Sequence, residues 1–365
     1  MKKIEINIPG KEYPVYIGIN IFDSLDKIIR SKKLFRNLFL VIDRNVMNLH
    51  REDIKRFTSN FSGKVSVHEF AASEVEKNFV SLSKLVDDLI TKGFGRDTLI
   101  IAVGGGITGD IAGFAAATFM RGVKFIQVPT TLLAAVDSSI GGKTGINSGD
   151  TKNTVGAIYQ PEFVLIDTEF LKTLPEEEII CGVGEIVKYA FLIDPKFFLT
   201  CKNYLPKLLK TDSAVASKII DTCISFKGDV VSEDEKENGL RKILNLGHTF
   251  AHAVEIEQNF KIKHGQAVII GLVCALDLSK RIGLLDEKLF NEYLKLPLML
   301  KDKIVLRKFD TARIYEIMKR DKKGRDHKIK FVLLHDVGNV VVDVEVCESD
   351  VTQSIQQGMN YFIQQ

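Results

Sequence analysis

The sequence lacks the features that mark several large classes of protein. Its five cysteines include no Cys-x-x-Cys pair, and this odd, scattered set predicts a reduced cytoplasmic protein without a disulfide framework or a cysteine-bound metal. No apolar run is long enough to cross a bilayer, so no membrane partner is expected. A net charge of +3 and the absence of basic runs with interleaved aromatics argue against a nucleic-acid partner. The first residues also lack the apolar core of a signal peptide.

The composition is that of an ordinary globular enzyme. The chain has 365 residues, of which 45% are hydrophobic and 27% charged, enough for two domains. Apolar runs alternate with helical patterns up to Pro175, which predicts a Rossmann-like, doubly wound α/β domain over residues 1–172. Helical patterns dominate residues 173–365, which we predict to be a mainly helical domain. The predicted strands are two within residues 1–20 and then 38–42, 65–70, 98–103, 331–334 and 339–346; the predicted helices are 79–91, 107–118, 219–231, 244–258, 267–281 and 311–319.

A glycine-rich turn follows the most apolar predicted strand. Residues 104–109 satisfy G-x-G-x-x-G between the strand 98–103 and the helix 107–118. Glycines let a backbone approach a pyrophosphate, whose charge the start of a helix favours. The acidic residue expected about 20 residues later is absent, and Asp43 and Asp110 are candidate substitutes. The turn therefore predicts a dinucleotide site that departs from the usual layout.

Three of the seven histidines lie close together in the helical half. His248 and His252 are four residues apart, a spacing that places both imidazoles on one helix face, as a divalent metal requires. Arg241 and Asn245, seven and three residues before His248, continue the same helix face. The alternative is a pair of histidines in polar contacts between packed helices. A face this polar beside apolar neighbours is costly to bury, which favours the lining of a site.

Two further segments carry charged residues among small ones. Lys143, Lys152 and Asn153 lie in a glycine- and serine-rich stretch that suits an anion such as a phosphate monoester, although a flexible surface loop is the alternative. Glu185 and Lys188 are three residues apart and share a helix face. They form either a surface ion pair or a metal ligand beside a substrate-binding lysine, and the spacing does not choose between the two.

Together these segments closely resemble the 3-dehydroquinate synthase family. The matching blocks follow the family's order through nearly the whole chain, and jointly they are highly specific. They are Gly104–Asp110, Gly113-Phe114, Arg121-Gly122, Pro129–Ala134, Asp137–Lys143, Lys152-Asn153, Gly184–Lys188, Lys227, Arg241–His252, His264-Gly265 and Asp321–Lys323.

The resemblance implies cofactors, a homodimer and a role for each matching residue. It implies NAD in the N-terminal domain, and one divalent metal, zinc or cobalt, in the C-terminal domain that also binds substrate. Glu185, His248 and His264 match the ligand positions, in place of the His248–His252 pair that spacing favours, and His252 matches an acid/base position. Substrate positions match Asp137, Lys143, Asn153, Lys188, Lys227, Arg241, Asn245 and Lys322 or Lys323, with Arg121 reaching the neighbouring subunit's site; NAD positions match Asp43, Glu74, Lys77, Gly105, Gly106, Asp110, Thr130, Thr131, Lys143, Lys152 and Thr173.

A few positions depart from the family's pattern. Ser73 stands where a glycine usually precedes the Glu74-x-x-Lys77 pair, and Ala251 replaces the common glycine between the histidines. Gln266 replaces the usual glutamate after His264-Gly265, and Ala190 stands where a glycine often follows the aromatic residue. None of these changes removes a matched metal ligand.

The activity that the resemblance implies belongs to the shikimate pathway of aromatic amino acid biosynthesis. The substrate would be 3-deoxy-D-arabino-heptulosonate 7-phosphate, converted to 3-dehydroquinate and phosphate with NAD reduced and then regenerated, a net lyase reaction. One alternative is a cyclase whose sugar phosphate lacks the carboxylate, which Arg241, Asn245 and Lys322/Lys323 argue against. Another is a metal-dependent polyol dehydrogenase, which would consume NAD. The intact candidate ligands disfavour a third, an inactive binding relative.

Overall fold

A computed structural model describes residues 1–33, 37–149, 151–306, 308–321 and 328–363. The chain folds into two compact units. The first unit contains Met1–Leu174 and Thr211–Glu235, and the second contains Pro175–Lys210 and Lys236–Gln365. No helix in the described part of the chain is both long and apolar enough to cross a membrane.

The first unit is built on one twisted sheet and a separate hairpin. In the hairpin, β7 (Lys143–Ser148) pairs with β8 (Thr151–Ile158). Lys143, Lys152 and Asn153 therefore lie on strands and not in a flexible surface loop. The sheet contains β1 (Lys2–Ile8), β2 (Lys11–Gly18), β3 (Asn37–Asp43), β4 (Lys64–Phe70), β5 (Thr98–Gly104), β6 (Lys124–Pro129) and β9 (Phe163–Asp167). Its order is β1-β2-β9-β6-β5-β3-β4, and every pairing is parallel except that of β1 with β2.

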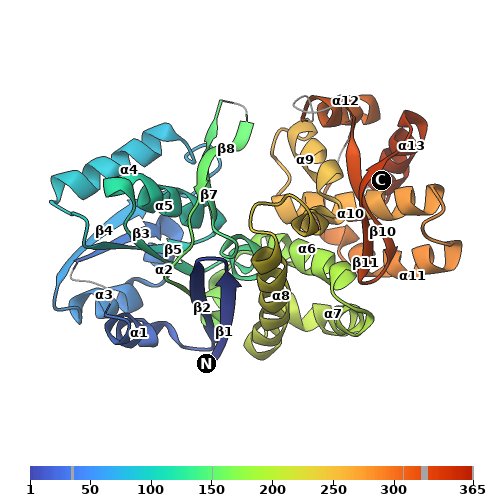
Figure 1. Ribbon diagram of the computed structural model, residues 1–365. Helices are drawn as coiled ribbons and strands as arrows, with labels where there is room; N and C mark the ends of the chain where they lie inside the picture. The colour runs from blue at the N-terminus through green and yellow to red at the C-terminus, as the bar shows by residue number, and fades with distance from the viewer. Residues whose placement is uncertain (34–36, 150, 307, 322–327, 364–365) are drawn as a thin grey trace. The chain divides into compact units, whose positions relative to one another are not determined.

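The central strands are apolar along their whole length because helices cover both faces of the sheet. On one face, Leu38 and Leu40 pack with α1 (Leu25–Ser31) and α3 (Arg51–Ser59). On the other, Phe39 and Val41 pack with α4 (Phe79–Thr91) and α5 (Gly106–Thr118). Figure 1 shows these two helical layers. The alternation of side chains along β3 thus fills two cores, which confirms the predicted α/β architecture.

The strand order reverses between β3 and β5. From β3 the chain passes to β4 on one side and then crosses to β5 on the other side of β3. Ligands of such sheets bind at the carboxyl ends of the strands, where the order reverses. β3 ends at Asp43, which caps α2 (Arg44–Leu49), and β5 ends at the glycine-rich turn. The topology therefore brings these two segments to the same edge of the sheet.

One long helix belongs to a different unit from the one its position in the sequence indicates. Helix α8 (Ser213–Glu233) was expected in the C-terminal domain, but residues 211–235 group with the first unit. It packs on β1, where a Cβ on Gly228 would lie 2.5 Å from Ile6 Cδ1, and Lys2 pairs with Asp221 at 2.6 Å (Figure 1). Helical periodicity identified the helix within residues 219–231, but periodicity does not specify a packing partner.

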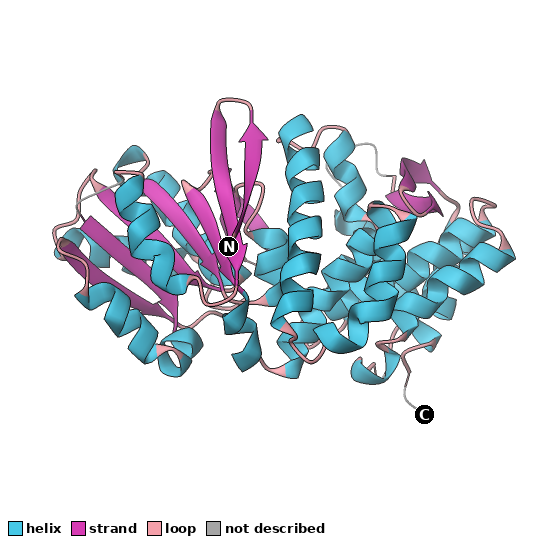
Figure 2. Ribbon diagram, turned by 90° about the horizontal axis from the view of Figure 1, so that it is seen from below, coloured by secondary structure: helices cyan, strands magenta, loops and turns pink. Residues whose placement is uncertain are grey.

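The second unit is mainly helical, with one small sheet (Figure 2). Helix α10 (His264–Arg281) is almost entirely buried, and other helices surround it. The elements in contact with α10 are α6 (Glu176–Leu192), α9 (His248–Glu257), α11 (Glu287–Leu298), α13 (Glu348–Asn360) and β10 (Lys330–Asp336). The unit also contains α7 (Pro195–Leu208), α12 (Thr311–Asp321) and β11 (Asn339–Glu345).

The helix predicted over 244–258 is shorter than expected at its amino end. Residues Leu240–Asn245 form a separate 3-10 helix, and α9 begins at His248. Gly247 separates the two with a left-handed φ of 77°, which a glycine adopts at little cost. The expectation that Arg241 and Asn245 share one helix face with His248 and His252 is therefore wrong.

Candidate active site

The three residues predicted as metal ligands come together in the second unit. Glu185 lies in the buried middle of α6, while His248 and His264 are the first residues of α9 and α10. Glu185 Oε1 lies 3.1 Å from His264 Nε2 and 3.5 Å from His248 Nε2. One ligand atom from each residue lies within 4.8 Å of the other two. The structure thus groups His248 with Glu185 and His264, as the family positions indicate.

Glycines next to these residues allow the helices that carry them to approach closely. A Cβ on Gly265 would lie 1.8 Å from the carbonyl oxygen of Cys181, and one on Gly184 would lie 2.1 Å from that of Gly265. The backbones of α6 and α10 are therefore nearly in contact beside Glu185 and His264. A similar contact joins Gly271 of α10 to the carbonyl oxygen of Gly247, beside His248.

Gly265→Ala is expected to move His264 away from Glu185. The atom that the new Cβ meets belongs to backbone, so α6 or α10 must shift. Such overpacking typically costs about 1–3 kcal/mol of unfolding free energy. Zinc content per chain and a urea denaturation curve measure both effects. Gly95→Ala is the control, because a Cβ there meets only Asp97 Oδ1, at 3.6 Å. Wild-type values for both quantities in Gly265→Ala would contradict this account of the site.

The electrostatics of the cluster suit a cation. Burial acts to raise the pKa of Glu185, but Lys188 and His248 hold it well below its usual range, so the carboxylate is ionised. Burial acts to lower the pKa of His264, but hydrogen bonds with Glu185 and Glu255 outweigh burial and raise it to about 10. One carboxylate oxygen and two imidazole nitrogens form a donor set that fits zinc or cobalt and leaves a position for substrate.

The predicted substrate-binding residues of the second unit lie on α6 and α9, which carry this cluster, and on the 3-10 helix that precedes α9. Lys188 contacts Glu185 Oε2 from the next turn of α6, and both are buried, so the pair is not on the surface. Arg241 is only 2% exposed, and Asn245 on the same 3-10 helix donates to Glu237 Oε1 at 2.6 Å. His252 is exposed on α9, with its ring 5.5 Å from that of His248.

In the first unit, the glycines of the glycine-rich turn let neighbouring side chains approach the backbone closely at the start of α5. Gly105 caps the start of α5, and a Cβ there would meet Thr131 Cγ2 at 2.9 Å. A Cβ on Gly106 would meet Ser138 Oγ at 2.8 Å. The amide of Thr130 donates to the carbonyl of Gly104, which holds the ends of β5 and β6 together. This cradle at the start of a helix fits the pyrophosphate of NAD.

A buried lysine joins the predicted cofactor residues to the β7–β8 hairpin. Lys77 contacts the Asp110 carboxylate and the side-chain oxygen of Asn153. Glu74 accepts from Asn147 Nδ2 at 3.0 Å and lies 3.6 Å from Lys152 Nζ. The loop after β4 and the hairpin are thus connected through polar side chains from both.

Further residues predicted to bind substrate or NAD also lie in the first unit. Lys227 of α8 lies 2.9 Å from Asp137 Oδ1 and donates to the Asp137 carbonyl at 2.8 Å. Lys143 begins β7, and Thr173 lies 2.9 Å from His50 Nε2. Arg121 is exposed and has a left-handed φ of 67°. Lys322 and Lys323 lie outside the described residues.

Sequence reasoning did not single out three residues that contact the site. Glu255 lies 3.3 Å from His264 Nδ1, Glu237 binds Asn245, and Asn147 bridges Glu74 to the backbone of Lys77 and Asn153. Helical spacing could have identified Glu255, because it lies seven residues after His248 and three after His252, on the same face of α9. The other two act across loops, whose contacts carry no periodic signal.

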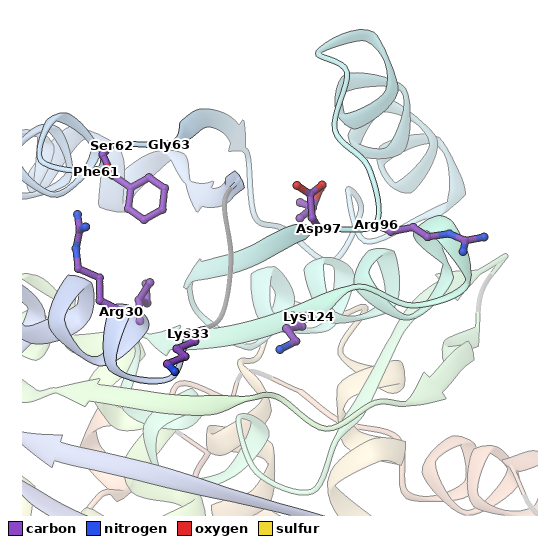
Figure 3. Close-up of a pocket in the computed structure, with 10 residues that line it drawn as sticks. Arg30, Lys33, Phe61, Ser62, Gly63, Arg96, Asp97 and Lys124 are labelled. Atoms are coloured by element: carbon purple, nitrogen blue, oxygen red, sulfur yellow. The ribbon is translucent and has the colours of Figure 1, made fainter.

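A separate cavity of about 960 Å³ lies in the first unit, away from these groups. Figure 3 shows Arg30, Lys33, Arg96 and Lys124 among its lining residues. Thr98 and Lys124, which also line it, are the first residues of β5 and β6. The cavity therefore lies at the amino ends of the strands, the opposite edge of the sheet from the glycine-rich turn.

Comparisons with known proteins find relatives that match nearly the whole chain. The family described as 3-dehydroquinate synthase N-terminal matches residues 67–181, and 3-dehydroquinate synthase C-terminal matches residues 182–324. The 3-dehydroquinate synthase of Pelagibacter ubique (strain HTCC1062) is 40% identical over 359 residues, which cover 96% of each chain.

Two solved structures share the fold over nearly the whole chain. A 2-deoxy-scyllo-inosose synthase complexed with carbaglucose-6-phosphate, NAD+ and Co2+ is 29% identical, with a TM-score of 0.86, and the match covers 98% of this chain and 100% of that one. The 2-epi-5-epi-valiolone synthase of Streptomyces hygroscopicus subsp. jinggangensis 5008, with NAD+ and Zn2+ bound, is 24% identical with a TM-score of 0.87, covering 95% and 97% of the two chains.

Proposed function

Because the chain belongs to the 3-dehydroquinate synthase family, we propose that it converts 3-deoxy-D-arabino-heptulosonate 7-phosphate to 3-dehydroquinate and phosphate. The observation that carries the proposal is the cluster of Glu185, His248 and His264 on helices that also carry the buried cation Lys188. The net reaction is that of a phosphorus–oxygen lyase in aromatic amino acid biosynthesis, because the hydride taken from the substrate returns to it.

The two cofactors have separate places in the proposal. Glu185, His248 and His264 would hold zinc or cobalt, which supplies Lewis-acid polarisation of a substrate hydroxyl. The glycine-rich turn, with Asp43, Glu74, Lys77, Asp110, Thr130, Thr131, Lys152 and Thr173, would hold NAD, which supplies a reversible hydride acceptor.

The remaining residues bind the two anionic ends of the substrate and move its protons. Arg241 binds the carboxylate, because a guanidinium matches its planar, two-oxygen geometry. The cations Lys143, Lys188 and Lys227, with Asn153, fix the phosphate and the ring hydroxyls, and Asp137 orients Lys227 at 2.9 Å. His252, exposed on α9, carries protons on a ring nitrogen during ring opening and closure.

A second candidate is a cyclase for a sugar phosphate that lacks the carboxylate, which the likeness to the 2-deoxy-scyllo-inosose synthase favours. The buried Arg241 distinguishes the two, because its planar guanidinium matches a carboxylate, which only the heptulosonate phosphate carries. The relatives named 3-dehydroquinate synthase also have the higher identity, 37–40% against 29%.

The test of the proposed function uses NAD in small amounts. The chain is incubated with zinc, an excess of the heptulosonate phosphate and a hundredth as much NAD, and phosphate release and absorbance at the NADH maximum are followed. We expect phosphate release to exceed the NAD supplied many times, without lasting NADH. NADH formed in an amount equal to the NAD supplied, without phosphate release, would instead identify a dehydrogenase. Glucose 6-phosphate in place of the acid tests the second candidate.

We further propose that the enzyme works as a cytoplasmic homodimer. Scattered cysteines in a reduced state and the exposed Arg121, matched to a position that reaches the neighbouring subunit, support this proposal. Light scattering coupled to gel filtration gives the mass. If the proposal holds, wild type mixed with a small excess of an inactive Arg241 variant forms dimers that contain one subunit of each kind. A monomeric protein would form no such mixed dimers.

A further inference from the structure

The His264 ring lies between two buried carboxylates on opposite sides. Its Nε2 is 3.1 Å from Glu185 Oε1, and its Nδ1 is 3.3 Å from Glu255 Oε2. Glu255 is on α9, and its side chain is 5% exposed. Both nitrogens therefore have a specific partner, and the two partners come from different helices.

These contacts place His264 in two overlapping groups of potential ligands. Glu185, His248 and His264 form one, and His252, Glu255 and His264 form the other. A neutral imidazole carries one N–H and one lone pair. His264 can thus offer a lone pair to only one group at a time, and the group it serves depends on which nitrogen holds the proton.

We propose that Glu255 is a positioning residue that keeps the proton of His264 on Nδ1 and so directs the Nε2 lone pair to the metal site with Glu185 and His248. The inference rests on the metal site of the proposed function. A carboxylate that accepts from the second nitrogen of a metal-binding histidine fixes both the tautomer and the ring plane.

The geometry favours this role over that of a ligand in a second site. With the proton on Nδ1, the second group has only His252 and Glu255 left, which is too few for tight binding. Glu255 also lies on α9, whose first residue is His248. One short helix therefore positions both the ligand His248 and the carboxylate that contacts the other histidine ligand, His264. The chain therefore takes one metal ion at this site.

The experiment compares Glu255→Ala and Glu255→Gln with the matched control Glu257→Gln. Glu257 is a second buried carboxylate of α9, but its partners are Gln258 and the amide of Asp310. Zinc affinity is measured by competition with a chelator, zinc per chain by elemental analysis, and site geometry by the visible spectrum of the cobalt-loaded protein. A urea denaturation curve of each zinc-free variant reports the fold.

We expect Glu255→Ala to weaken zinc binding by about 10–100-fold and to change the cobalt spectrum. Glu255→Gln should keep part of the affinity, because its amide oxygen still accepts from Nδ1–H, and Glu257→Gln should match wild type. Unchanged affinity and spectrum in Glu255→Ala overturn the inference and leave the proposed metal site intact. Two zinc ions per wild-type chain, with one lost in Glu255→Ala, overturn it as well by making Glu255 a ligand. If wild type binds no zinc, the proposed site itself fails.

Discussion

A His264→Ala variant is expected to lose its metal and, with it, all measurable turnover, while keeping its fold. The substitution removes one of three donors and leaves Glu185 and His248 with a single carboxylate and a single imidazole. Loss of a residue that hydrogen-bonds to a metal ligand typically weakens metal binding by about 10–100-fold. Loss of a ligand itself should therefore weaken binding by more than that. Metal content after dialysis and the rate of phosphate release measure the two effects.

His252→Ala is the matched comparison for that variant. Both changes remove an imidazole from the same part of the second unit, and the two rings lie 6.0 Å apart. The His252 variant should keep its zinc and lose activity, because its proposed role is proton transfer. Chelation of wild type should reproduce the His264 result without unfolding the protein. Equal metal loss in the two variants would instead indicate that His248 and His252, which are four residues apart, are both ligands.

Arg241→Ala is expected to slow turnover of the heptulosonate phosphate by at least two orders of magnitude. Removing one partner of a buried, hydrogen-bonded charge pair costs about 2–5 kcal/mol, and each 1.4 kcal/mol or so is a tenfold change in rate. Arg241→Lys should recover only part of this loss, since an ammonium cannot form two parallel hydrogen bonds with a carboxylate. The ratio kcat/KM gives the effect, and zinc content should not change.

Lys242→Ala is the control for the Arg241 variant. It removes the next cation on the same 3-10 helix, but Lys242 is partly exposed and pairs with Asp343 at 2.7 Å. Its activity should stay close to wild type. Wild type should also turn over glucose 6-phosphate poorly, because that sugar offers no carboxylate to the guanidinium. Preference for glucose 6-phosphate over the heptulosonate phosphate, or normal activity in Arg241→Ala, would make the chain a different cyclase.

The sequence predicted the architecture well where one segment determines its own structure. The apolar runs 38–42 and 98–103 are β3 and β5, and the turn after β5 leads into α5 as expected. The predicted ligands Glu185, His248 and His264 also come together. In this case family positions were needed, because residues separated by 63 and 16 positions carry no periodic signal of proximity.

The sequence alone was wrong, undecided or silent where a tertiary contact or one backbone angle determines the structure. Apolar spacing extended α9 back through Asn245, but the left-handed φ of Gly247 ends any regular helix there. The surface ion pair considered for Glu185 and Lys188 is buried, because glycine contacts bring α6 against α10. The closeness of Glu255 to His264 likewise depends on how two helices cross, which neither helix encodes alone.

The return of the chain to the first unit at residues 211–235 has a consequence for how the protein is made. The β1–β2 hairpin leaves the ribosome before its partner α8, which is synthesised more than 200 residues later; Lys2 and Asp221 are 219 positions apart. Contacts this distant in sequence form slowly. Until they form, the apolar surface around Ile6 stays open to water and to other nascent chains, the usual origin of aggregation during synthesis. A fragment that stops at Leu174 would keep that surface permanently uncovered.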